Sequence, residues 1–321
     1  MKQYLIRLAT ALFCLLLLSG CDAEKLVVTN GFARDEVFRV ETSACTTREI
    51  SVYLVNLQNE YAEIAAPGEA VKETCLNLAS QVKIMNLMAE RMNITLEGPE
   101  ITKAQEAAEA YYRSLTEADI TAMEDVTQEN IRRMYLEMAL ADKVYAYAVR
   151  DINPEISDDE ARTITVEQIM VRKGTDAGKA LQKITEAEAL IAAGDDFAQT
   201  LQAYNEAETA RVSFGTGEGD GIPEQEAFAL ETGQISGILE TDTAYYLLRC
   251  VSSFDREQTR ENKARIVRRR KHEAFGKMYD SFVEEVTIEL NEPLWESLEI
   301  PEGGHTTSSF WTTYESFFGE E

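Results

Sequence analysis

The sequence predicts an α+β protein in which helical segments flank a smaller unit that contains a β-sheet. Between Thr46 and Val149, apolar residues recur at the three- and four-residue spacing of amphipathic helices. The segment from Thr163 to Val251 instead follows the order βαααββ, and helical spacing returns from Asp255 to Leu290. Such grouping of helices and strands into separate regions favours an α+β fold over an all-helical one.

The first residues have the features of a lipoprotein signal. A short positive region and an apolar run from Leu8 to Leu18 precede Ser19, Gly20 and Cys21. Small residues before a cysteine are typical of a lipobox, where the thiol accepts a diacylglyceryl group. An uncleaved anchor helix would require ~20 apolar residues, which is more than this run contains. We therefore expect residues 1–20 to be removed and Cys21 to tether the protein to the outer side of a cell membrane.

The charge of the chain narrows the classes of partner. The sequence has 31 Lys and Arg against 57 Asp and Glu, a formal charge of −26. A field of this sign repels nucleic acid, so we expect no nucleic-acid partner, whereas it suits solubility or basic unfolded clients. The basic run from Arg265 to Lys271 is a local exception. We expect it to be a solvated helix face that packs against the acidic N-terminal helices.

Three cysteines remain once the signal and the lipid site are set aside. Cys45 and Cys75 could form a disulfide in an oxidising compartment. Cys250 lies in the apolar run from Tyr245 to Val251 and is expected in the core. Because an odd count argues against a disulfide framework, free thiols are the alternative.

Two local patterns define the start of the helical region. The segment from Leu26 to Glu41 is rich in valine and contains the turn signal Asn30-Gly31, which predicts a small strand pair. Thr46 and Glu49 have the spacing of a capping box, so the first helix is expected to begin there. The aromatic tail from Phe310 to Phe318 is expected either to dock on the body of the protein or to occupy a client site.

The middle region has a clear order of elements. Its helices and strands are predicted, in chain order, as a strand at Thr163–Val171, helices at Ala177–Ala193, Phe197–Tyr204 and Glu224–Leu230, and strands at Ile235–Leu239 and Ala244–Val251. Asp195 and Asp196 are placed to cap the second of these helices. The glycine-rich loop from Gly215 to Gly221 lacks the Lys and the strand-to-helix context of a phosphate-binding loop. No histidine cluster suggests a metal, so neither a metal nor a cofactor is expected.

Four segments of this region resemble a parvulin-type prolyl isomerase domain. They are Val166-Glu167-Gln168-Ile169-Met170-Val171, Gly194-Asp195-Asp196-Phe197-Ala198-Gln199-Thr200-Leu201, Glu226-Ala227-Phe228-Ala229-Leu230-Glu231-Thr232-Gly233-Gln234-Ile235-Ser236, and Tyr245-Tyr246-Leu247-Leu248-Arg249. With the lipobox and the flanking helices, the whole chain resembles the PrsA-like foldase lipoproteins and their SurA-type relatives. The resemblance implies a four-stranded antiparallel sheet surrounded by helices, inserted into a helical chaperone domain.

The resemblance also implies a domain organisation and partners. The expected parts are, in order, a signal peptide at 1–20, a mainly helical chaperone domain at 21–160, the parvulin-like domain at 161–254, a C-terminal helix packed on the N-terminal domain at 255–300, and a tail at 301–321. Unfolded or nascent secreted polypeptides are the implied partners, together with the membrane through the lipid anchor. By analogy with the family, a homodimer is possible.

The family's catalytic positions can be carried over onto this sequence. Parvulins use two histidines on adjacent strands with a Cys or Asp beside them, and here these positions fall on Gln168, Tyr246 and Ala207. Gln168 and Tyr246 could exchange hydrogen bonds, but neither titrates near neutral pH as histidine does. The only histidines of the mature chain, His272 and His305, lie outside this domain.

The proline pocket of the family is also altered. Positions that are usually Leu, Met and Phe fall on Arg211, Gly219 and Pro223, and Phe214 and Phe228 at the ends of the aligned stretch complete the family-equivalent substrate pocket. The resemblance therefore implies a foldase whose isomerase site is degenerate. An active prolyl isomerase is the enzyme alternative, and a solute-binding lipoprotein, which would need two α/β lobes and a cleft, is the alternative of another class.

Overall fold

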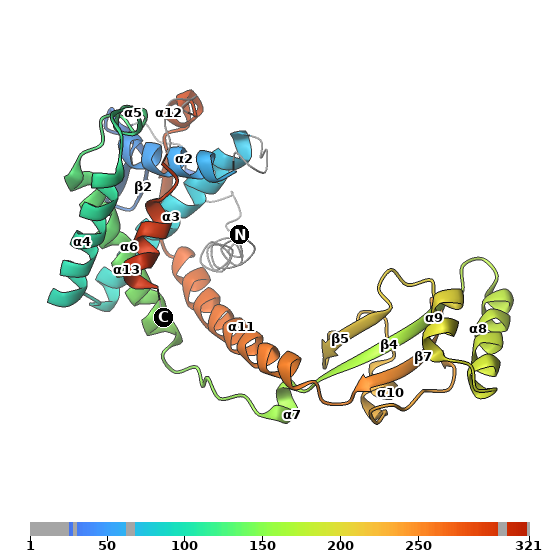
Figure 1. Ribbon diagram of the computed structural model, residues 1–321. Helices are drawn as coiled ribbons and strands as arrows, with labels where there is room; N and C mark the ends of the chain where they lie inside the picture. Colours follow the sequence, from blue (N-terminus) through green and yellow to red (C-terminus); the bar gives the residue numbers. More distant parts are fainter. Residues whose placement is uncertain (1–25, 28–30, 62–67, 301–306, 320–321) are drawn as a thin grey trace. The chain divides into compact units, whose positions relative to one another are not determined.

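The structure is a computed structural model that describes residues 26–27, 31–61, 68–300 and 307–319. The chain divides into two compact units, unit 1 formed by Met1–Asp151 with His272–Glu321, and unit 2 formed by Ile152–Lys271 (Figure 1). Both units combine helices with a sheet, and the predicted α+β class is confirmed. No described helix is long and apolar enough to cross a membrane. The expected signal and Cys21 lie outside the described residues.

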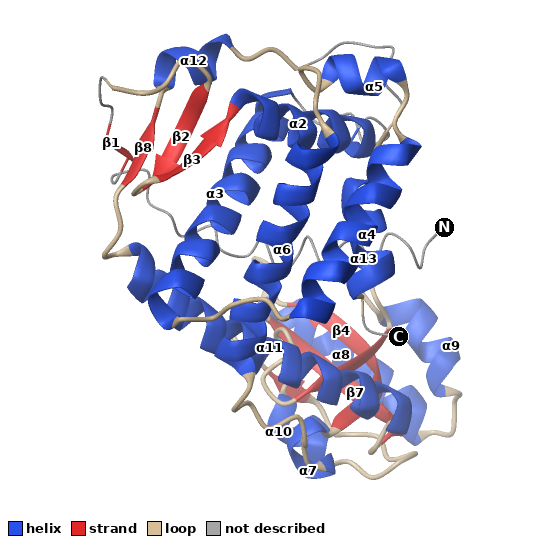
Figure 2. Cartoon of the chain, turned by 90° about the vertical axis from the view of Figure 1, so that its left-hand side faces the viewer, coloured by secondary structure: helices blue, strands red, loops and turns tan. Residues whose placement is uncertain are grey.

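Unit 1 is built mainly from helices that pack side by side (Figure 2). They are α2 (Thr47–Tyr61), α3 (Gly68–Met92), α4 (Gly98–Ser114), α5 (Glu117–Ala122), α6 (Gln128–Val149), the C-terminal part of α11 (Arg256–Val283), α12 (Glu292–Ser297) and α13 (Phe310–Phe318). The predicted capping box is confirmed at the start of α2. The backbone N–H of Thr46 donates to the Glu49 carboxylate at 3.0 Å, and the Glu49 N–H donates back to the Thr46 hydroxyl at 3.4 Å.

A small sheet lies at one end of these helices (Figure 2). Its strands are β1 (Leu26–Val27), β2 (Glu36–Val40), β3 (Ser43–Thr46) and β8 (Ile288–Leu290), in the order β1-β8-β2-β3. The prediction that β1 and β2 form a strand pair is wrong, because β8 lies between them and pairs with both. A distant segment therefore supplies the hydrogen bonds that a local turn was expected to provide.

The last long helix is shorter than the sequence pattern predicted. α11 ends at Val283, and the following residues form β8 instead of continuing to Leu290 as helix. Thr287 and Ile288 are β-branched and favour an extended backbone, and Ile288 pairs with Val40 of β2. In unit 1, Phe275 of α11 packs on Tyr145 of α6, with ring centres 5.3 Å apart.

The aromatic tail docks on unit 1 as α13. Phe310 is fully buried, and its ring packs on Tyr53, Tyr111 and Tyr135 at centroid distances of 5.6, 5.3 and 4.8 Å. The Tyr135 hydroxyl donates to the Phe310 carbonyl at 2.6 Å, and the Phe310 N–H donates to the Asn56 side chain at 3.1 Å. The N-terminal end of α13 is thus part of the core, and the first of the two expectations for the tail is the one observed.

Unit 2 contains a four-stranded antiparallel sheet with helices around it. Its elements are α7 (Asp158–Ala161), β4 (Thr163–Arg172), α8 (Ala177–Ala192), α9 (Phe197–Tyr204), β5 (Arg211–Gly215), α10 (Glu224–Ala229), β6 (Leu239–Glu240) and β7 (Ala244–Ser252). The strand order is β5-β4-β7-β6. The residue pattern did not indicate β5, whereas the predicted cap of α9 is present, since Asp196 accepts hydrogen bonds from Ala198 and Gln199.

The two faces of this sheet have different cores. Alternate residues of β4 and β7 point to opposite faces. One face packs on α8 and α9 through residues that include Ile169, Val171 and Leu247. The other face carries Val166, Tyr246 and the hydrophobic cluster that packs around them, including residues of α10. The second face is the one that holds the predicted catalytic positions.

The basic run on α11 finds acidic partners within unit 2. Arg265 lies 2.6 Å from Glu218 of the glycine-rich loop, and Arg270 forms an ion pair with Glu160 of α7. The expectation that the run pairs with the N-terminal helices is wrong for these two arginines. These two arginines instead bind the glycine-rich loop and α7 of their own unit.

Candidate functional site

The predicted catalytic positions lie on one face of the unit 2 sheet. In the β4–β7 register, Gln168 is opposite Leu248 and Met170 is opposite Tyr246. Residues directly opposite each other share a face, and so do residues two apart on one strand. Gln168 and Tyr246 are therefore diagonal neighbours on the same face, as two catalytic residues on adjacent strands would be.

The Gln168 side chain fastens a loop. It is 7% exposed, and its amide nitrogen donates to the Thr209 carbonyl at 2.8 Å. Its backbone N–H donates to the Ala210 carbonyl, also at 2.8 Å. Within the described part of the chain, the expected hydrogen bond between Gln168 and Tyr246 is not formed. The Gln168 side chain therefore stabilises the loop of residues 205–210.

Ala207 lies in the loop that Gln168 holds. Its N–H donates to the side-chain oxygen of Asn205 at 3.1 Å, and the same oxygen accepts from the N–H of Met170 at 2.9 Å. Asn205 therefore clips the loop to β4, a role that the sequence reasoning missed. Its position directly after α9 was the available signal, because Asn favours such caps and turns. The methyl side chain of Ala207 offers no acid, base or nucleophile.

Tyr246 presents a neutral phenol. Its side chain is 6% exposed, and a Cβ placed on Gly221 would lie 3.7 Å from its hydroxyl oxygen. Burial raises the pKa of Tyr246, the Arg172 charge lowers it and the Asp220 charge raises it, with a net upward shift. The hydroxyl is thus a hydrogen-bond donor at neutral pH and not a base.

Three of the family-equivalent pocket positions, Arg211, Gly219 and Pro223, do not form an apolar wall. Arg211 is exposed at the start of β5, and Pro223 precedes α10 as its N-cap residue. The N–H groups of Gly217 and Gly219 donate to the two carboxylate oxygens of Glu224 at 2.8 and 2.6 Å. This carboxylate holds the glycine-rich loop, and a Cβ on Gly219 would lie 2.6 Å from Glu224 Cγ.

Other residues keep this face apolar. Phe214 and Phe228 meet edge to face at 5.8 Å, and they belong to the hydrophobic cluster that contains Tyr246. The half-buried members of this cluster are Met170, Val212, Ile222, Phe228 and Leu239. The face retains apolar surface, which comes from the family-equivalent positions Phe214 and Phe228 and from residues outside the aligned pocket, such as Met170 and Val212. The alternation along β4 could have indicated Met170, which is two residues after Gln168.

Cys45 and Cys75 are both buried free thiols in the structure. Burial raises the pKa of each thiol, with nearby Glu49 adding to the rise for Cys45. The Cys75 thiol donates to the Ile50 carbonyl at 3.6 Å. A thiol in such surroundings stays protonated and behaves as a small apolar side chain.

Unit 1 contains an apolar groove of about 270 Å³, which we call the helical groove. Its walls come from α3, α6, α11 and α13. The lining residues are Gln81, Val82, Met85, Met138, Ala141, Asp142, Tyr145, Phe275, Trp311, Tyr314, Glu315, Phe318 and Gly319. Two methionines and five aromatic rings give the groove a deformable apolar lining, which sequence reasoning could not assemble because it joins four separate helices.

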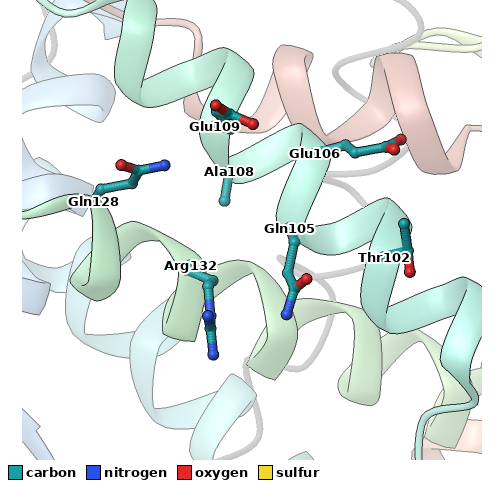
Figure 3. Close-up of a pocket in the computed structure, with 7 residues that line it drawn as sticks. All are labelled: Thr102, Gln105, Glu106, Ala108, Glu109, Gln128 and Arg132. Atoms are coloured by element: carbon teal, nitrogen blue, oxygen red, sulfur yellow. The ribbon is translucent and has the colours of Figure 1, made fainter.

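A second hollow of about 280 Å³ lies between α4 and α6 and is polar (Figure 3). Its lining includes Gln105, Glu106, Glu109 and Arg132. Glu109 forms an ion pair with Arg113, and Arg132 lies 3.5 Å from Glu129. These charges are paired at the surface, so the hollow lacks the apolar walls that distinguish the helical groove.

Several solved structures are similar to this chain. A peptidylprolyl isomerase (PrsA) from Bacillus cereus is 13% identical with a TM-score of 0.37, covering 92% of this chain and 99% of that chain. PrsA from Bacillus subtilis is 15% identical with a TM-score of 0.29, covering 87% and 99%. A SurA-like chaperone from Campylobacter jejuni is 13% identical with a TM-score of 0.32, covering 80% and 99%. No protein-family model and no curated protein matches the chain.

Proposed function

We propose that the protein is a membrane-tethered extracytoplasmic foldase, which binds secreted polypeptides before they fold, and that its parvulin-like unit has lost efficient isomerase chemistry. The observation that carries the proposal is the helical groove. Its methionine and aromatic lining suits apolar side chains that a non-native chain exposes, because such a surface can repack around different sequences.

The chemistry of the unit 2 face supports the second half of the proposal. An X-Pro bond isomerises over a barrier of ~18–20 kcal/mol, and a catalyst must favour the twisted amide over the planar one. The Gln168 side-chain amide donates a hydrogen bond to the Thr209 carbonyl, and the raised pKa of Tyr246 keeps its hydroxyl protonated at neutral pH. Neither side chain can share protons at neutral pH as a pair of histidines can.

The lipid tether at Cys21 would give this surface its effect. Acyl chains each contribute ~0.8 kcal/mol per buried methylene, so two or three chains hold a protein at a membrane without a spanning helix. A chaperone surface held where translocated chains emerge meets them at high local concentration. In this proposal, the location of the protein at the membrane contributes more to its function than isomerase activity does.

An active prolyl isomerase is a second candidate, and one observation favours it. The Phe214 and Phe228 pair lies in the same cluster as Met170 and Tyr246, so apolar surface for a proline ring is present beside a hydrogen-bond donor. A solute-binding lipoprotein is less well supported, because unit 1 is mainly helical and is not an α/β lobe.

A folding assay tests the chaperone proposal. The mature protein, at a stoichiometric ratio, should suppress the aggregation of an unfolded secreted protein as followed by light scattering. Met138→Glu places a charge in the wall of the helical groove and should weaken this effect, whereas the matched change Gln105→Glu in the polar hollow should not. Wild-type protein that leaves aggregation unchanged would contradict the proposal.

An isomerisation assay separates the two candidates. With a proline peptide, the mature protein should accelerate isomerisation little above background. If the rate is instead high and falls sharply in Tyr246→Phe or Gln168→Ala, the protein is an active isomerase. The proposal that unit 2 has lost efficient isomerase chemistry is then wrong.

The tether has its own test. Cys21→Ser should leave the protein unprocessed or release it from the membrane fraction, and it should abolish the effect on secretion. Cys250→Ser, a change at another thiol, should leave fractionation unchanged. Membrane retention of the Cys21→Ser protein would rule out lipid anchoring at this residue.

A further inference from the structure

The helical groove is lined by a glutamine whose amide bonds to no other described residue. Gln81 of α3 is 5% exposed, lines the groove, and forms no hydrogen bond with any part of the chain that the structure describes. A glutamine amide can donate two hydrogen bonds and accept two. Because the Gln81 amide lines the groove and bonds to no described residue, a ligand with amide groups would gain hydrogen bonds there.

Two carboxylates lie in the same groove. Asp142 of α6 is exposed to solvent there and accepts a hydrogen bond from the hydroxyl of Tyr314, and Glu315 follows Tyr314 on α13. Among the residues that the structure describes, no Lys or Arg lines the groove. Lys103 lies over the Phe318 ring at 5.0 Å, and Lys143 is bound to Glu100 at 2.6 Å.

The carboxylates and their surroundings favour a cationic ligand. Desolvation raises the pKa of Asp142, although the hydrogen bond from Tyr314 acts in the opposite direction. Desolvation and the nearby Asp142 charge both raise the pKa of Glu315. The Asp142 charge disfavours the charge on Glu315, and an ammonium or guanidinium group beside the two carboxylates would stabilise both. The strongly negative net charge of the chain also attracts cationic segments.

The groove is not the binding site of α13, because α13 is already docked on unit 1 and forms one wall of the groove. The N-terminal end of α13 is held by hydrogen bonds from Tyr135 and to Asn56, and Phe310 is fully buried. Its C-terminal part forms one wall of the groove through Tyr314 and Phe318, whose rings stack at 4.6 Å. The occupant must therefore come from outside the described fold.

We propose that the helical groove binds a non-native polypeptide segment in which an aromatic or aliphatic residue is followed by a lysine or arginine. The apolar side chain packs between the methionines and aromatic rings, the cation pairs with Asp142 and Glu315, and Gln81 bonds the segment's backbone. This inference rests on the proposed foldase function and names the class of segment that the foldase selects.

A single-tryptophan protein reports binding directly. The chain has two tryptophans, and Trp295→Phe leaves Trp311 in the groove wall as the only one. Three short Gly/Ser peptides serve as probes, with a central Phe-Lys, Phe-Gln or Ser-Lys pair. The Phe-Lys peptide should change Trp311 emission and bind about tenfold more tightly than Phe-Gln, because a charge-assisted hydrogen bond contributes about that factor. The Ser-Lys peptide should bind more weakly than either.

Matched variants assign the preference to the groove. Asp142→Asn with Glu315→Gln should remove the advantage of Phe-Lys over Phe-Gln, whereas Glu106→Gln with Glu109→Gln, which removes the same charge from the polar hollow, should keep it. Gln81→Leu should weaken the Phe-Lys and Phe-Gln peptides alike, by about fivefold, through the loss of backbone hydrogen bonds. Unchanged thermal unfolding would show that each variant is folded.

The outcomes separate this inference from the proposed function. Equal binding of Phe-Lys and Phe-Gln, or a preference that survives loss of Asp142 and Glu315 or is lost equally in the control, overturns the inference. If the wild-type protein still suppresses aggregation in that case, the foldase function stands without this selectivity. If the wild-type protein suppresses no aggregation, the foldase proposal fails by itself.

Discussion

The ammonium group of Lys83 lies 2.8 Å from a carboxylate oxygen of Glu49 in the interior of the helical unit, and the two side chains are only 5% and 2% exposed. Lys83 is also 2.8 Å from Glu137, and Arg133 is 3.2 Å from Glu49. The cluster joins α2, α3 and α6. Because α3 and α6 also form walls of the helical groove, these ion pairs stabilise the arrangement of the groove.

Removing Lys83 should destabilise the protein strongly. Lys83→Met leaves the buried Glu49 carboxylate and the partly buried Glu137 carboxylate with only Arg133 nearby, and removing one partner of a buried ion pair costs about 3–5 kcal/mol. The free energy of unfolding from urea titration, followed by circular dichroism, measures the loss. Lys143→Met, which removes a more exposed pair with Glu100, should have a clearly smaller effect. Equal losses in the two variants would contradict the structural role of Lys83.

The same cluster predicts a dependence of stability on acid. Desolvation opposes the charge on Glu49, but the Lys83 ammonium and the hydrogen bond from Thr46 outweigh it, so the pKa of Glu49 lies below its ordinary value of 4.5. Its contribution is therefore complete above the ordinary value and is lost as pH falls through the lower, folded value. Urea titrations of wild type and Glu49→Gln should differ most near neutral pH and converge in acid. A difference that grows as pH falls would show that the sign is wrong.

Gln168 should matter for stability more than for activity. Gln168→Ala removes the hydrogen bond to Thr209 and should lower the free energy of unfolding by about 1–2 kcal/mol. Gln199→Ala, on the exposed side of α9, serves as the control and should change it little. Suppression of aggregation should be the same in both variants. A loss of suppression without a loss of stability in Gln168→Ala would place Gln168 in the client site instead.

Phe310 should be a core residue despite its position near the C-terminus. Phe310→Ala should cost about 3–5 kcal/mol, because its ring is fully buried among three tyrosines. Phe318→Ala, at the half-buried end of α13, should cost much less. Chemical denaturation of the two variants gives the comparison, and a mild effect of Phe310→Ala would mean that α13 detaches easily.

Much of the local structure could be predicted because its causes are local. Thr46 with Glu49, and Asp196 with the start of α9, satisfy free N–H groups within three residues, so spacing alone identifies them. Likewise, the sequence directly gives glutamine at position 168 and tyrosine at position 246, where the resemblance to parvulins predicts histidines. The register that places these two positions on one face follows the alternation of β4 and β7.

Other features depend on contacts between distant segments. The pairing of β8 with β2 replaced a predicted hairpin and shortened a predicted helix, because backbone hydrogen bonds from a remote strand outweigh local preference. The Gln168 amide binds the Thr209 carbonyl and so stabilises a loop instead of facing a substrate. The residues next to Gln168 in the sequence do not indicate this contact.

The sequence by itself determined the class of fold, the helix caps and the residue types at the two positions where the resemblance predicts catalytic histidines, since each depends on residue type and short spacing. Only the tertiary structure decided that Gln81, Asp142 and Glu315 line one apolar groove, because packing brings together α3, α6, α11 and α13 from both ends of the chain. Burial and electrostatic coupling arise from that packing, and they turn ordinary glutamine and carboxylate side chains into a candidate recognition site.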